Sequence, residues 1–116
     1  MPKLVALISK RDSISEADFK TYYETHHVPL IKSLFPTIAG YKRTYLLEEH
    51  SLNETLPLES DGVQQQVNVI TEIIFDDEDG LNEFFARGTH EDVVEAIRKD
   101  EAHFLDGEKT LMYRVE

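Results

Sequence analysis

The chain has 116 residues, of which 41% are apolar, and this is enough for one globular domain with its own hydrophobic core. Twelve Lys and Arg against 23 Asp and Glu give a net charge of −11, which repels nucleic acid and anionic lipids, so neither nucleic acid nor a membrane is an expected partner. No apolar run approaches the roughly 18 residues of a membrane span. The sequence has no cysteine, which excludes thiolate chemistry and fits the reducing cytosol, so we expect a cytoplasmic protein.

Hydrophobic periodicity predicts strands and helices that alternate along the chain. The predicted elements, in chain order, are a strand at 3–10, a helix at 16–34, strands at 40–47 and 67–75, a short helix from 76 to 88, a helix from about 91 to 104, and a strand at 110–115. Ser15 is a good N-cap for the first helix, and Thr89 with Asp92 resembles a capping box for the last. The segment 48–62 is expected to be an acidic loop.

This order of elements predicts an α+β fold of the ferredoxin-like, split βαβ type. In that fold the helices cover one face of an antiparallel four-stranded sheet. The strands at 3–10 and 67–75 are apolar on both faces, and one layer of helices covers only one of them. The most economical cover for the second face is the identical sheet of another copy, so we predict a homodimer.

The most unusual segment is 22–30, where the apolar side of the first predicted helix carries two tyrosines and two histidines. Burying such polar groups requires hydrogen-bond partners. Pro29 has no N–H to donate to the carbonyl of Thr25, so a kink is expected beside the histidines. The combination suggests a lined pocket, with plain packing as the alternative.

Several segments resemble the EthD-like family of small dimeric α+β barrel proteins. These are 3–7, 15–19, the pair Tyr22 and Tyr23, the motif His27-Val28-Pro29-Leu30, and, in the second half, 84–89, Asp100 and 104–106. The resemblance implies that residues 1–116 form a single EthD-like domain, interrupted by the acidic loop, whose sheets pair across a dimer to form a dimeric α+β barrel. It also implies a pocket between sheet and helices in each subunit.

His27 occupies the histidine position of the motif and is the leading candidate for catalysis. Its unperturbed pKa near 6.5 would let it take or give a proton near neutral pH. Asp100 follows Ile97 by three residues and precedes Phe104 by four, so it lies inside the apolar stripe of the last helix and needs a partner there. An Asp100–His27 pair would fix the imidazole tautomer and raise its basicity. The alternative is a buried polar clamp without chemistry.

Three aromatic side chains and a second histidine complete the predicted site. Tyr23 is the candidate for holding an oxyanion through its hydroxyl, and Tyr22, His26 and Phe104 are candidates for contacting the ligand. Each has a plainer alternative, since aromatic residues on the buried side of a helix usually belong to the core and His26 could be exposed.

No metal or other cofactor is expected. His26 and His27 are adjacent, so they point about 100° apart on a helix and do not readily chelate one ion. No glycine-rich loop between a strand and a helix suggests phosphate or dinucleotide binding. Some relatives with this fold bind haem, which leaves haem iron at His27 open as an alternative.

Members of the superfamily include polyketide cyclases, dehydratases, muconolactone isomerases and cofactor-free monooxygenases, and the fold alone does not choose among them. We therefore predict a cofactor-independent enzyme in which His27 moves a proton for cyclisation, dehydration or isomerisation of a small apolar or aromatic compound that is a carbonyl or a phenol. The alternative is a non-catalytic ligand-binding or accessory homodimer of a catabolic pathway. A third possibility is an interaction protein with a filled core.

Overall fold

The computed structural model describes residues 1–47 and 67–116. Its strands are Lys3–Ile8 (β1), Ile38–Tyr45 (β2), Val69–Phe75 (β3) and Leu111–Val115 (β4). Its helical segments are Glu16–Tyr22 (α1), Tyr23–His27 (η1), Val28–Leu34 (α2), Glu78–Arg87 (α3) and Glu91–Glu101 (α4). The predicted elements are present, and the first predicted helix is divided into α1, η1 and α2. The acidic loop predicted at 48–62 lies outside the described residues.

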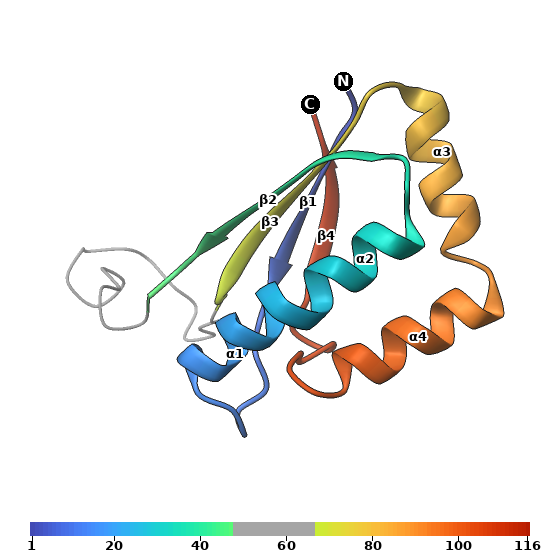
Figure 1. Cartoon of the computed structure of the whole chain (residues 1–116). Helices are drawn as coiled ribbons and strands as arrows, with labels where there is room; N and C mark the ends of the chain where they lie inside the picture. The colour runs from blue at the N-terminus through green and yellow to red at the C-terminus, as the bar shows by residue number, and fades with distance from the viewer. Residues whose placement is uncertain (48–66) are drawn as a thin grey trace.

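The four strands form one antiparallel sheet in the order β2-β3-β1-β4. In this sheet Val5 of β1 pairs with Glu72 of β3 on one side and with Tyr113 of β4 on the other. Figure 1 shows all the helices on one side of the sheet, with the two termini close together at one end. The predicted ferredoxin-like α+β architecture is therefore confirmed.

Side chains at the helix ends determine where α1 and α3 begin, as predicted for Ser15. The Ser15 Oγ accepts a hydrogen bond from the Asp18 backbone N–H at 3.1 Å, and the Asp77 side chain accepts one from Gly80 at 2.8 Å. The capping box predicted at Thr89 is wrong. The N-cap of α4 is His90, which makes no side-chain capping bond. The Thr89 hydroxyl instead donates to the Ala86 carbonyl at 2.7 Å, because it lies just past α3 and satisfies one of its last carbonyls.

The kink predicted beside Pro29 takes the form of a π-helical turn, η1. The Val28 N–H donates to the Tyr23 carbonyl, five residues earlier, where an α-helix would use a residue four earlier. Pro29, in the first turn of α2, has no N–H to restore the regular pattern. A row of buried side chains runs along this irregular helix at every fourth position: Phe19, Tyr23, His27, Ile31 and Phe35.

The core lies between the sheet and the helices, and the other face of the sheet is left without a helix in the described part of the chain (Figure 1). Alternation in β3 is regular, with Val69, Thr71, Ile73 and Phe75 buried and the residues between them half-buried. We call the second face the open face. The strand register places these apolar residues on it: Val5, Leu7, Ile70, Ile74, Leu111, Tyr113 and Val115.

Candidate functional site

A cavity of about 370 Å³ lies between the sheet and the helices. Its walls come from the sheet and the helices, because β1, β2, β3, β4, η1, α2, α3 and α4 all contribute lining residues. The lining is mostly apolar and aromatic: Ala6, Ile8, Tyr23, His27, Ile31, Phe35, Tyr41, Thr71, Ile73, Phe84, Phe85, Gly88, Thr89, Ile97, Glu101, Phe104, Leu105, Thr110 and Met112. None of these lining residues, all from the described ranges, is a lysine or an arginine. The size and lining suit a small apolar molecule.

His27 lines this cavity and contacts Asp100, which lies outside the lining, although 73 residues separate the two in the chain. The His27 Nδ1 lies 2.6 Å from the Asp100 Oδ2, and both residues are buried, at 6% and 7% exposure. A carboxylate accepts hydrogen bonds, so its partner Nδ1 carries the proton and Nε2 is the ring nitrogen left for a ligand. The predicted pair of residues thus lies in the geometry of a carboxylate-oriented imidazole.

Tyr22 holds the other oxygen of the same carboxylate. Its hydroxyl donates to the Asp100 Oδ1 at 3.0 Å. Burial, followed by the hydrogen bond and charge of Asp100, raises the pKa of Tyr22 to about 12, so the hydroxyl remains a neutral donor at physiological pH. Tyr22 does not belong to the cavity lining, and its ring packs on His26, with 4.8 Å between the ring centroids. Tyr22 therefore contacts Asp100 from outside the cavity and is not placed to contact a ligand there.

The other predicted site residues divide between the cavity and the surface. Phe104 is fully buried and lines the cavity. His26 is exposed and lies outside the lining. Tyr23 is also fully buried and lines the cavity, and its hydroxyl lies 2.6 Å from the Thr71 Oγ1. Burial raises the pKa of Tyr23, so the phenol stays protonated, and that hydroxyl already has a protein partner.

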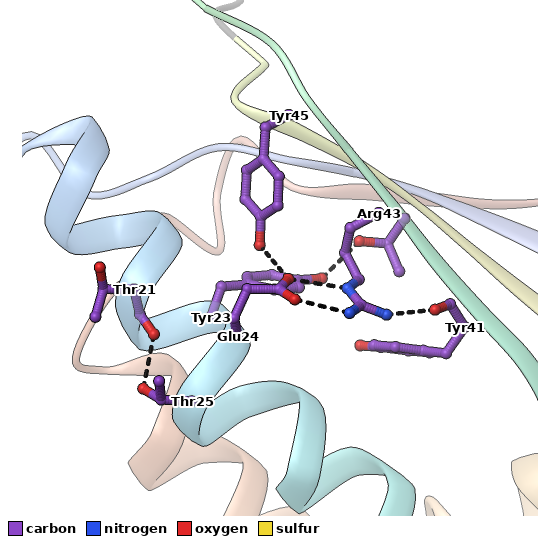
Figure 2. A network of polar contacts seen from close by, with 8 residues as sticks. Thr21, Tyr23, Glu24, Thr25, Tyr41, Arg43 and Tyr45 are labelled. Carbon is purple, nitrogen blue, oxygen red and sulfur yellow. Dashed lines mark hydrogen bonds and ion pairs between the residues drawn. The ribbon is translucent and has the colours of Figure 1, made fainter.

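A second polar network, beside the cavity, ties η1 to β2, as Figure 2 shows. The Arg43 guanidinium binds the Glu24 carboxylate with two hydrogen bonds of 2.9 and 2.7 Å, and the Tyr45 hydroxyl donates to the same carboxylate at 2.6 Å. Arg43 also donates to the Tyr41 carbonyl. Bidentate contacts of this kind fix orientation as well as distance. The network therefore holds the turn that carries His27 against the sheet.

The Glu24 network makes stability depend on acid in a defined direction. The hydrogen bonds from Arg43, opposed by burial and assisted by Tyr45, lower the pKa of Glu24 from 4.5 to about 2. The unfolded chain therefore binds this proton first as the pH falls, and the stabilisation present above pH 4.5 is lost towards pH 2. We expect the stability advantage of the wild type over Glu24→Gln to shrink between pH 6 and pH 3, as measured by urea unfolding. Exposed Glu83→Gln is the control, and an advantage independent of pH would contradict the prediction.

Glu101 is a titratable residue of the cavity that the sequence analysis did not predict. It lies four residues after Ile97 on α4, so the two side chains share one face of the helix and both line the cavity. Burial raises the pKa of the Glu101 carboxyl, with the charge of His27 acting in the opposite direction. The available signal was its one-turn spacing from an apolar residue, but a glutamate next to the solvent-facing side of a helix is usually exposed.

The described residues also bear on metal binding and on membrane insertion. Within residues 1–47 and 67–116, no three or more His, Cys, Asp or Glu side chains are grouped so that they could hold a metal ion. Over the same residues, none of the helices has the length and apolar character needed to cross a membrane.

Comparison with solved structures identifies the fold. An EthD family protein from Bacillus halodurans has 20% identity and a TM-score of 0.61, with 100% of this chain and 98% of that chain covered. A dimeric ferredoxin-like protein of unknown function from Thermobifida fusca has 14% identity and a TM-score of 0.53, with coverage of 98% and 88%. A hydroxynitrile lyase from Passiflora edulis has 10% identity and a TM-score of 0.57, with coverage of 99% and 93%. At such identities the similarity shows the fold alone.

No protein of curated function matches the sequence significantly. The family model described as the EthD domain matches residues 11–108, which include η1, α4 and the His27–Asp100 pair. The chain therefore belongs to the EthD-domain family, as its sequence motifs predicted.

Proposed function

We propose that the protein is a cofactor-independent enzyme that transfers a proton on a small, neutral carbonyl or phenolic compound. The observation that carries this proposal is the buried contact of 2.6 Å between Asp100 and His27, a residue that lines an apolar cavity. A solved structure with the same fold is named a hydroxynitrile lyase, so in that protein the fold supports lyase chemistry.

The proposed step needs only groups that line or support the cavity. The His27 Nε2 takes a proton from the carbon beside a carbonyl group, the C–H electron pair moves into the enolate, and the proton stays on the imidazole. Asp100 stabilises the imidazolium formed in this way, because its carboxylate already accepts the Nδ1–H. The imidazolium then returns its proton to oxygen or to another carbon of the ligand. General base catalysis of this kind contributes about 10²–10⁴-fold in rate.

One observation favours the alternative of a non-catalytic, ligand-binding protein. The Tyr23 hydroxyl, which we had predicted to hold an oxyanion, is fully buried and bonded to Thr71 at 2.6 Å. An enolate oxygen would then have to displace that contact or find another donor. In this alternative the His27–Asp100 pair only orients a bound molecule.

The first test is a thermal-shift screen of planar phenols, quinones and unsaturated lactones on the wild type, His27→Ala and His26→Ala. His26 is the matched control, because it is the adjacent histidine but is exposed and outside the cavity. We expect ligands to stabilise the wild type and His26→Ala but not His27→Ala, since only His27 lies on the cavity wall. Equal stabilisation of all three proteins would mean that His27 does not control the site. An absence of hits, with His27→Ala melting several degrees lower, would make His27 a structural clamp.

We also propose that two copies pair through their open faces. The apolar residues of that face would otherwise stay in contact with water, and Leu111 and Tyr113 are 38% and 53% exposed in the single chain. The similar protein from Thermobifida fusca is described as dimeric.

Leu7→Glu tests the dimer, because it places a charge on an inner strand of the open face, between Ile70 and Leu111. We expect dimerisation to weaken at least about tenfold, since a buried, unpaired carboxylate is strongly unfavourable. Sedimentation velocity over a concentration series measures this. Val94→Glu on the helical side of the molecule, where Val94 is 36% exposed, is the control. A dimer that is unaffected by Leu7→Glu, or a wild-type monomer, would contradict the proposal.

A further inference from the structure

Glu101 is the only carboxylate among the described residues that line the cavity. The Glu101 side chain is half-buried at the end of α4, one turn after Ile97 and one residue after Asp100. Asp100 accepts hydrogen bonds from His27 and Tyr22. Within residues 1–47 and 67–116 no group donates a hydrogen bond to the Glu101 carboxylate, whose electrostatic neighbours are His27 and Asp100. The two adjacent carboxylates of α4 thus differ. Asp100 receives its hydrogen bonds from the protein, whereas Glu101 has no donor among the described residues and can accept a hydrogen bond from a ligand.

A half-buried carboxylate without a protein donor depends on water for its hydrogen bonds, and a ligand that fills the cavity must replace those bonds with its own donor. The rest of the lining offers it no Lys or Arg, and its hydroxyl groups come from Tyr23, Tyr41, Thr71, Thr89 and Thr110. A hydrogen bond to an ionised acceptor is shorter and stronger than one between neutral groups. A ligand that brings its own donor would therefore bind better than one of the same shape without a donor, and an anionic ligand would be repelled.

We propose that Glu101 accepts a hydrogen bond from a hydroxyl group of the ligand, so that the cavity selects neutral hydroxylated aromatic compounds over aryl carboxylates. This inference rests on the proposed function, because both require a small, neutral ligand in the cavity beside His27. A hydroxyl is favoured over an ammonium group because an ammonium loses far more hydration on entering a cavity lined mainly by apolar side chains. The ring of such a ligand would lie among the aromatic side chains of Phe84, Phe85 and Phe104.

The test compares four probes that share one ring system and differ in one substituent: 2-naphthol, 2-methylnaphthalene, 2-naphthoate and 2-naphthylmethylamine. Dissociation constants are measured at pH 7 by calorimetry or by fluorescence titration. We expect the wild type to bind 2-naphthol at least tenfold more tightly than 2-methylnaphthalene, and to bind 2-naphthoate most weakly. In Glu101→Gln the preference for the hydroxyl should fall below threefold, and 2-naphthoate should bind more tightly than it does to the wild type.

Glu95→Gln is the matched control, because Glu95 is an exposed carboxylate on the same helix and pairs with Lys99 at 3.7 Å. It should leave all four constants unchanged. Glu101→Met, which is unbranched and of similar length, provides a second way to remove the acceptor if the glutamine variant folds poorly. A purely structural role for Glu101 would weaken all probes together without changing their ratio.

The outcomes separate this inference from the proposed function. An unchanged hydroxyl preference in both Glu101 variants would overturn the role of Glu101, and so would a wild type that prefers the carboxylate or the amine. If ligand binding still depends on His27 in those cases, the proposed function stands and only the selection by Glu101 is lost. If none of the four probes binds the wild type, the aromatic ligand class is wrong and the role of Glu101 is overturned, whereas the proposed function falls only if the thermal-shift screen also finds no ligand.

Discussion

Under the proposed function, Asp100→Asn should slow proton exchange at the carbon beside a carbonyl group by about 10²-fold or more. In the wild type the Asp100 carboxylate accepts from the His27 Nδ1 at 2.6 Å and from the Tyr22 hydroxyl at 3.0 Å. An asparagine has one acceptor oxygen for these two donors, and its NH₂ group favours the imidazole tautomer with the proton on Nε2. In that tautomer His27 has no lone pair facing the cavity, so it cannot act as a base.

The measurement follows deuterium uptake from D₂O into 2-tetralone by NMR, because this neutral bicyclic ketone has acidic protons beside its carbonyl group. Tyr22→Phe is the control, since it removes only the 3.0 Å hydrogen bond to Asp100 and leaves the contact with His27. We expect it to retain most of the exchange activity and to lose about 1 kcal/mol of stability. Exchange at the wild-type rate in Asp100→Asn would contradict the proposed chemistry, whereas exchange at the solvent rate in the wild type would favour the ligand-binding alternative.

The largest expected loss of stability comes from Phe104→Ala, at about 3–5 kcal/mol in the free energy of unfolding. Phe104 is fully buried, and its ring centroid lies 5.7 Å from that of Phe19, 5.6 Å from that of Tyr23 and 5.0 Å from that of His27. Truncation would remove this shared packing and enlarge an existing cavity, which the surrounding helices and sheet can close only in part.

Urea unfolding at pH 7 measures the change caused by Phe104→Ala. Phe85→Ala is the control, because Phe85 also lines the cavity but is 50% exposed, and we expect it to cost less than about 1 kcal/mol. A loss below about 1.5 kcal/mol for Phe104→Ala would contradict this prediction. It would show that the surrounding residues close the space left by the ring, so that Phe104 is not needed to hold His27 in place.

The sequence predicted the architecture and the His27–Asp100 pair for a common physical reason. Periodic burial fixes which side of a helix faces the sheet, and a carboxylate inside an apolar stripe must find a partner on the neighbouring helix. Asp100 met this condition because Val93 and Ile97 define the stripe that contains it. Such reasoning works where one polar residue interrupts an otherwise apolar face.

The same reasoning could not predict how deeply each side chain is buried or which side chain it contacts. It placed Tyr22, Tyr23, His26 and His27 on one broad side, whereas Tyr23 and His27 are buried, Tyr22 is half-buried and His26 is exposed. It also could not foresee that Arg43 of β2 would reach Glu24 of η1, because that contact depends on how the helix crosses the sheet. Glu101 was missed for a related reason, since half-burial at a cavity edge leaves no signature in periodicity.

The π-helical turn has a consequence for the length of the helical segment. Phe19 and Phe35 are sixteen residues apart, so in an uninterrupted α-helix, at about 100° per residue, they would point about 160° away from each other. A π turn acts as one inserted residue, which reduces that angle to about 60° and lets both rings face the sheet. The segment thus contains one residue more than the packing of its two ends requires. Removing a residue from the turn would preserve the alignment of the flanking helices, and the surplus residue lies in the turn that carries His27.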